Sequence, residues 1–191
     1  MLQSVTPTED LFSITWNLGP RCNFECSYCP PRLHNKVNKH VDLATLILRW
    51  EDIVTKTAHR NKRYKISFTG GEVSLNPNFL PFLAWLRKEH ADSIASIGFT
   101  TNGSASKRFY NKAIQYADWI SFSSHFEFAK PDKLWNNILN THVTAVKMKR
   151  SVYVNIMAEN RPEADMLQTL CQAHRIPHGV NEINWEWHAK G

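Results

Sequence analysis

Apolar and polar positions recur along the chain with two periods, and this pattern predicts six strands separated by five helices. The strand-like stretches are residues 13–18, 64–72, 96–103, 119–128, 151–159 and 181–189. The stretches with helical spacing of apolar residues are 42–59, 76–90, 106–117, 131–142 and 163–174. Because strands and helices alternate, we expect an α/β fold with parallel strands joined by right-handed crossovers. One domain is expected over residues 1–191.

The number of repeats decides which parallel architecture is favoured. A closed eightfold barrel takes about 250 residues, whereas this chain has 191. Six strands therefore predict an open, partial (β/α)6 barrel, and a flat doubly wound sheet is the alternative. In parallel barrels the active site forms at the carboxyl ends of the strands. The chemically reactive residues of this sequence follow the predicted strands, which agrees with a barrel.

Composition narrows the class of protein further. No apolar run approaches the ~20 residues of a membrane span, and the N-terminus lacks the pattern of a signal peptide, so we expect a cytoplasmic protein without a membrane partner. The net charge of +6, from 23 basic and 17 acidic residues, favours an anionic partner. A solvated basic surface would explain the same balance.

Three of the four cysteines lie within eight residues as Cys22-x3-Cys26-x2-Cys29, directly after the first predicted strand. In a cytosolic protein, clustered thiols indicate metal or redox chemistry rather than disulfides. Three thiolates can bind three corners of a 4Fe–4S cluster, which leaves one iron without a protein ligand. The fourth cysteine, Cys171, falls on the apolar face of the last predicted helix, where we expect it to be part of the core.

With aromatic Tyr28 before the third cysteine, the motif resembles the signature of radical S-adenosylmethionine (SAM) enzymes. The resemblance implies that Cys22, Cys26 and Cys29 hold a 4Fe–4S cluster whose open iron binds SAM. It also implies an enzyme in which the reduced cluster gives one electron to SAM. The products would be methionine and a 5′-deoxyadenosyl radical that takes hydrogen from the substrate. The electron would come from an external donor such as a flavodoxin or ferredoxin.

The segment "TGGE" at 69–72 follows the second predicted strand and resembles the family segment that binds the methionyl amine of SAM. Gly70 and Gly71 allow the backbone to approach a ligand closely, and Glu72 can accept charge-assisted bonds from an ammonium group. Val73 stands where proline usually follows in the family, which is expected to change loop stiffness rather than ligand chemistry.

Polar residues on the third, fourth and fifth predicted strands extend the resemblance to the rest of SAM. Thr101 and Asn102 end the third strand in "TTNG" and are expected near the ribose or the amino-acid part. Ser121 and Ser123 resemble ribose-contacting positions of the family. Asn155 lies where the family often has a weak motif near adenine and ribose.

Period-two alternation over 119–128 puts His125 and Glu127 on the polar face of the fourth predicted strand. We expect these two residues to contact the substrate or transfer protons, and a hydrogen-bonded structural histidine is the alternative for His125. In the last predicted strand, Trp185 and Trp187 are expected either to wall the adenine or substrate or to cover an open barrel edge.

Two substrate classes agree with the sequence: a small anionic molecule, favoured by the basic balance, and a peptide, favoured by the open barrel edge. A protein partner is expected to help cover the open side. The rival function is a non-catalytic iron–sulfur or zinc-binding protein that binds or senses without cleaving SAM. A zinc site would complete a Cys3His set with His34 or His40, although zinc sites usually combine two separate ligand pairs.

Overall fold

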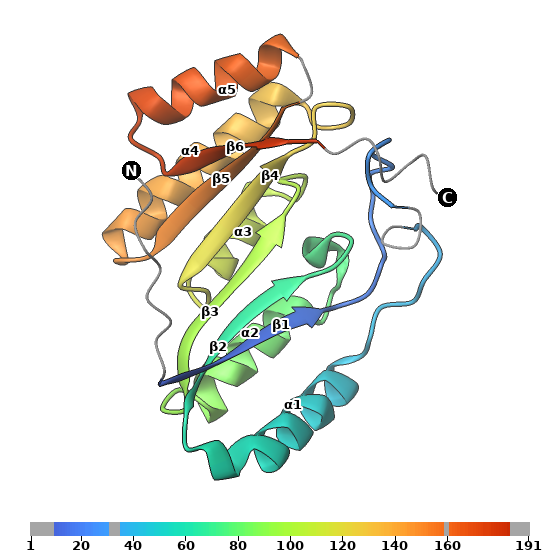
Figure 1. Cartoon of the computed structure of the whole chain (residues 1–191), viewed down its shortest axis with the longest axis vertical. Coiled ribbons are helices and arrows are strands. Elements are labelled where there is room, and N and C mark those ends of the chain that lie inside the picture. The colour runs from blue at the N-terminus through green and yellow to red at the C-terminus, as the bar shows by residue number, and fades with distance from the viewer. Residues whose placement is uncertain (1–9, 31–34, 159–160, 184–191) are drawn as a thin grey trace.

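Six parallel strands form one sheet whose order in space follows their order in the sequence, β1-β2-β3-β4-β5-β6 (Figure 1). The structure is a computed structural model that describes residues 10–30, 35–158 and 161–183. Its strands are β1 (Leu11–Asn17), β2 (Arg63–Thr69), β3 (Ile94–Thr101), β4 (Trp119–Ser124), β5 (Ser151–Ala158) and β6 (His178–Glu182).

The connections between the strands are helical. They are α1 (Leu43–Thr57), α2 (Phe79–Glu89), α3 (Lys107–Ala113), α4 (Pro131–Lys147) and α5 (Pro162–Ala173), with the short 3-10 turns η2 (Ala58–Arg60) and η3 (Val73–Leu75). Right-handed crossovers in sequential order bring every helix to the same side of the sheet, and the helices lie along the outside of the curved sheet (Figure 1). Among the described residues, none of the helices has the length and apolar character that a membrane span needs.

The sequential strand order confirms the predicted α/β partial barrel. A doubly wound sheet would reverse its strand order and carry helices on both faces. In the part of the chain that the structure describes, β1 and β6 are the two edges of the sheet, and the barrel is open between them. A ligand or a partner could therefore approach the sheet through the opening between the first and last strands.

Local sequence signals explain where α1 and α2 begin. The Asp42 side chain accepts a bond of 2.8 Å from the Thr45 backbone N–H and caps α1. Helix α2 begins three residues later than predicted, because the Asn76 side chain accepts a bond of 2.9 Å from the Asn78 N–H. This side-chain turn occupies the backbone that the helix would otherwise use.

Strands β4 and β6 differ most from the prediction. Strand β4 ends at Ser124, because the next residues turn and the His125 carbonyl accepts bonds from two backbone N–H groups at 3.0 and 2.7 Å. His125 and Glu127 therefore lie in the loop after β4, and the prediction that they alternate along the strand was wrong. Strand β6 begins at residue 178 instead of 181. The rest of the predicted strand, with Trp185 and Trp187, lies outside the described residues.

The two faces of the sheet have different chemistry. The face toward the helices carries the apolar core, which includes Phe68, Phe99 and Phe122, all fully buried. On the concave face, the register places polar residues side by side, as in the pair Ser123 and Asn155. This separation follows from the period-two pattern of the strands. The polar concave face and the loops at its carboxyl end are thus left for a ligand.

Candidate functional site

A cavity of about 190 Å³ lies at the carboxyl end of the sheet, and the three clustered cysteines line it. We call it the cysteine cavity. It brings together nine residues that the sequence singled out, namely Cys22, Cys26, Cys29, Gly70, Gly71, Thr101, Asn102, Ser123 and His125. Phe24, Thr69 and Thr100 complete its wall. The cavity therefore joins the loop after β1 to the ends of β2, β3 and β4.

The cysteine loop contains a tight turn, and its three cysteines line the cavity. The Cys29 N–H donates to the Cys26 carbonyl at 2.9 Å, and the Phe24 N–H donates to the Cys22 sulfur at 3.4 Å. The Asn102 side chain at the end of β3 contacts the same sulfur, with its Nδ2 atom 3.9 Å away. All three cysteines are free thiols. Backbone geometry and a neighbouring strand thus place three sulfur ligands around one space.

The electrostatics of the three thiols favour a positively charged ligand. Burial raises the pKa of all three, and that of Cys26 rises to about 12. The neighbouring Cys22 and Cys29 thiols add to the shift at Cys26, because thiolates repel one another. A bound metal group would supply the missing positive charge and release the protons on binding. The donor set therefore fits a metal group.

Three cysteine thiols are a donor set that agrees with a 4Fe–4S cluster, which is held by cysteine thiolates. Within residues 10–30, 35–158 and 161–183, no group of three His, Cys, Asp or Glu residues that could hold a single metal ion is found. His40, a candidate zinc ligand, lines a different cavity, and His34 lies outside the described residues.

The double glycine packs directly against the cysteine loop. The Gly71 N–H donates to the Gly19 carbonyl at 2.9 Å, and the Glu72 N–H donates to the Arg21 carbonyl at 2.8 Å. A side chain at Gly71 would meet the Arg21 carbonyl at 2.3 Å, and one at Gly70, where φ is +141°, would meet the Gly19 carbonyl at 2.6 Å. The glycines therefore permit a close approach to the chain itself, in addition to lining the cysteine cavity.

The Glu72 carboxylate connects the end of β2 to the end of β3. It is almost fully buried and accepts bonds from Thr101 Oγ1 at 2.7 Å, the Asn102 N–H at 2.6 Å and the Ser74 N–H at 3.0 Å. Burial raises the pKa of this carboxyl, and the same hydrogen bonds oppose the shift. The bonds hold the ends of two neighbouring strands in register.

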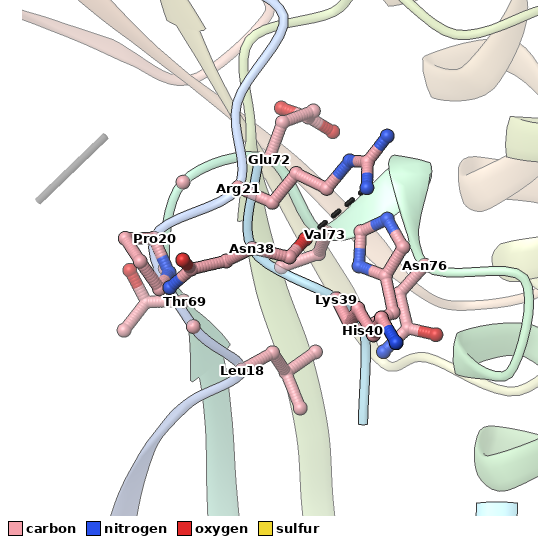
Figure 2. Close-up of a pocket in the computed structure, with 13 residues that line it drawn as sticks. Leu18, Pro20, Arg21, Asn38, Lys39, His40, Thr69, Glu72, Val73 and Asn76 are labelled. Atoms are coloured by element: carbon pink, nitrogen blue, oxygen red, sulfur yellow. Dashed lines mark hydrogen bonds between the residues drawn. The ribbon is translucent and has the colours of Figure 1, made fainter. Parts of the chain in front are cut away.

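Glu72 does not line the cysteine cavity. It lines a second, smaller cavity together with Arg21, Asn38 and His40, where the Arg21 guanidinium donates to the Asn38 carbonyl at 3.1 Å (Figure 2). The double glycine is a wall common to both cavities. The contact between the Glu72 carboxylate and the SAM ammonium therefore stays a prediction, as does backbone contact from Gly70 and Gly71.

Ser121 and Asn155 lie in a polar row on the concave face, outside the lining of the cysteine cavity. The Asn155 amide donates to Ser121 Oγ at 2.7 Å, and the Asn181 amide donates to Asn155 Oδ1 at 3.1 Å. The sequence reasoning missed Asn181, because its partner lies on the neighbouring strand, 26 residues away along the chain. The row spans β4, β5 and β6.

The two predicted catalytic residues contact the cysteine loop. The Tyr28 hydroxyl and His125 Nδ1 are 2.6 Å apart, and their rings stack with centroids 5.8 Å apart. The Ser27 N–H donates to Glu127 Oε2 at 2.6 Å, and the Ser27 hydroxyl donates to Glu127 Oε1. Ser27 had no signal in the sequence, because its partner lies 100 residues away. Proton transfer by His125 or Glu127 stays a prediction.

Acid is expected to destabilise the fold through His125. Burial lowers the pKa of His125 from 6.5 to about 4 against the opposing charge of Glu127. Because the unfolded chain then binds the proton more tightly, stability falls as pH drops from 6.5 toward 4, by about 3 kcal/mol in total. Urea unfolding of wild type and His125→Gln at about pH 7 and about pH 5 checks this. An equal pH dependence in both proteins would contradict it.

Curated relatives match about half of the chain. Over 89 residues this chain is 35% identical to molybdenum cofactor biosynthesis protein 1 of Bos taurus. The aligned stretch covers 46% of this chain and 13% of that protein. Over 98 residues it is 31% identical to GTP 3′,8-cyclase of Pasteurella multocida (strain Pm70). This stretch covers 51% of this chain and 26% of that protein. The aligned regions span about a quarter or less of these relatives.

Solved structures share the fold. SuiB of Streptococcus suis, bound to precursor peptide SuiA, matches with a TM-score of 0.67 and 17% identity over 90% of this chain and 39% of that one. SuiB bound to S-adenosylmethionine matches with a TM-score of 0.64 and 16% identity, again over 90% of this chain and 39% of that one. The structure of anSMEcpe with bound AdoMet matches with a TM-score of 0.61 and 14% identity over 91% of this chain and 50% of that one. At these identities the likeness concerns the fold alone.

A family model described as the radical SAM superfamily matches residues 16–138, which is more than half of the chain. The matched stretch runs from the end of β1 into α4. It therefore contains the three clustered cysteines, the double glycine and the ends of β2, β3 and β4, which together form the cysteine cavity. The chain belongs to the radical SAM superfamily, as its cysteine motif predicted.

Proposed function

We propose that this chain is an enzyme that reductively cleaves SAM and uses the resulting 5′-deoxyadenosyl radical to take hydrogen from a substrate. Members of its superfamily are typically enzymes. The observation that carries the proposal is the cysteine cavity, where three free thiols face the double glycine and the polar strand ends. When bound there, a 4Fe–4S cluster supplies the electron that breaks a carbon–sulfur bond of SAM.

The residues of the cysteine cavity would hold the cluster and bind SAM. Cys22, Cys26 and Cys29 would hold the cluster, because they are the only cysteines that line the cavity. Gly70 and Gly71 bring bare backbone to the cavity wall, next to the cysteine loop. We propose that this backbone binds the methionyl end of SAM, where an amine and a carboxylate need hydrogen-bonding groups at close range.

Other polar groups would orient the rest of SAM. Thr101 and Asn102 are held by Glu72 and line the cavity from the end of β3. Ser123 lines it from β4. We propose that these side chains position the ribose, and that Ser121 and Asn155 extend the polar surface toward the adenine along the concave face. Each side chain is fixed by its strand, which favours a single bound orientation.

The concave face is the proposed substrate site, since it is polar and open between β1 and β6. We propose either a small anionic molecule or a peptide as the substrate. Among similar proteins, one is a GTP 3′,8-cyclase, and SuiB has been crystallised with a precursor peptide. An external flavodoxin or ferredoxin would supply the electron. A protein partner would help cover the open side.

Product analysis tests the function directly. The protein is reconstituted with iron and sulfide without oxygen, given SAM and a strong reductant, and 5′-deoxyadenosine is quantified by chromatography with mass detection. We expect its formation to depend on the protein and to be lost in Cys26→Ala. The rival, a non-catalytic iron–sulfur or zinc protein, predicts no product and no SAM binding by calorimetry in metal-loaded protein. That pair of results would overturn the proposal.

A further inference from the structure

The loop after β4 holds both residues that separate Cys26 from Cys29. Glu127 accepts the Ser27 N–H at 2.6 Å and also the Ser27 hydroxyl, so its two carboxylate oxygens serve one residue. His125 bonds the Tyr28 hydroxyl at 2.6 Å. The partners are 100 and 97 residues apart along the chain. A distant loop therefore determines how the middle of the cysteine loop sits over the cavity.

The charge of Glu127 reaches the cysteine cavity. Its carboxylate bonds Ser27, the residue that follows Cys26, and His125, two residues before Glu127, lines the cavity. The Ser27 N–H is also directed to this carboxylate. An N–H engaged in this way is drawn away from hydrogen bonding to sulfur, one of the contacts that set the potential of an iron–sulfur cluster.

These two effects act in the same direction on a cluster held by the three cysteines. Reduction adds one negative charge to the cluster, so a nearby carboxylate disfavours the reduced state. Hydrogen bonds to sulfur favour the reduced state, and the Ser27 N–H is engaged elsewhere. Both effects lower the reduction potential, which makes the reduced cluster a stronger electron donor.

We propose that Glu127 is a positioning residue that holds the cysteine loop through Ser27 and lowers the reduction potential of the bound cluster. The proposal rests on the proposed function, since it requires a cluster. It assigns Glu127 a role in the strength of the reductant rather than in proton transfer to the substrate. His125 would hold the same loop through Tyr28 as a neutral ring.

A redox titration followed by electron paramagnetic resonance tests the charge effect. Glu127→Gln keeps the size of the side chain and removes the charge, so we expect the midpoint potential to shift upward at wild-type iron content. Ser27→Ala removes the hydroxyl bond but keeps the carboxylate and the N–H bond, so we expect little shift. Asp165→Asn makes the same charge change on the exposed side of α5 and should leave the potential unchanged.

Amide exchange of Ser27, followed by NMR in the protein without cluster, tests the contact alone. We expect faster exchange in Glu127→Ala than in wild type, and near-wild-type exchange in Glu127→Gln, whose amide oxygen can still accept. A loaded Glu127→Gln with unchanged potential would overturn this inference and leave the proposed function standing. Unchanged exchange in Glu127→Ala would also overturn it. A wild-type chain that binds no cluster would overturn both proposals.

Discussion

Alanine in place of Cys22, Cys26 or Cys29 is expected to abolish cluster binding, and with it the formation of 5′-deoxyadenosine. The three thiols line one cavity and are its only cysteine ligands, so each loss leaves an iron without a protein ligand. Changes in the surroundings of metal ligands already cost about 10–100-fold in affinity, and loss of a ligand should cost more. Iron and sulfide analysis after anaerobic reconstitution measures the effect.

Cys171→Ala is the matched control for these three variants. Cys171 is fully buried in the core on α5, and burial raises its pKa to about 11. This agrees with the prediction that it belongs to the core. The variant should bind the cluster as wild type does and lose only about 1–2 kcal/mol of stability from the cavity it leaves. Cluster loss in Cys171→Ala would contradict the assignment of the ligands.

Glu72→Ala is expected to destabilise the fold and weaken SAM binding while leaving the cluster intact. The change removes the acceptor for Thr101 Oγ1 and for the N–H groups of Asn102 and Ser74. Each buried donor without a partner costs about 1–3 kcal/mol, so the loss of stability should reach several kcal/mol. SAM affinity should fall because the end of β3 is no longer held beside the double glycine.

Glu72→Gln separates the shape of the side chain from its charge. Its single amide oxygen can accept fewer of the three donors, so we expect stability and SAM affinity between those of wild type and Glu72→Ala. Urea unfolding gives the stability, and titration of cluster-loaded protein gives the affinity. Unchanged SAM affinity in a folded Glu72→Ala would remove Glu72 from the binding site.

Much of the fold was predictable from local pattern. Among the described residues, six strands and five α-helices occur in the predicted order. The errors are at element ends. Strand β4 stops at Ser124 because the next residues close a turn on the His125 carbonyl, although the sequence continues to alternate. Alternation reports which residues suit a strand, and turn hydrogen bonds decide where the strand stops.

The candidate site was predictable where its residues are contiguous. The three thiols within eight residues and the two glycines before Glu72 can be recognised in the sequence, because their spacing is local. The reason for the glycines was only partly foreseen. Beyond lining the cysteine cavity, Gly70 and Gly71 lie against the carbonyl groups of Gly19 and Arg21, a contact between separate loops.

The sequence by itself determined the α/β class, the polar and apolar faces of the strands and the local cysteine motif of the family, because each depends on the spacing of neighbouring residues. Tertiary structure alone decided that the Ser27 N–H meets Glu127, that Tyr28 meets His125 and that Asn155 meets Ser121 and Asn181. These contacts depend on strand register and on the crossover that brings each strand beside the next. Backbone hydrogen bonds and the packing of the core determine the strand register and the crossovers. They join residues that are far apart in the sequence, which the spacing of neighbouring residues does not reveal.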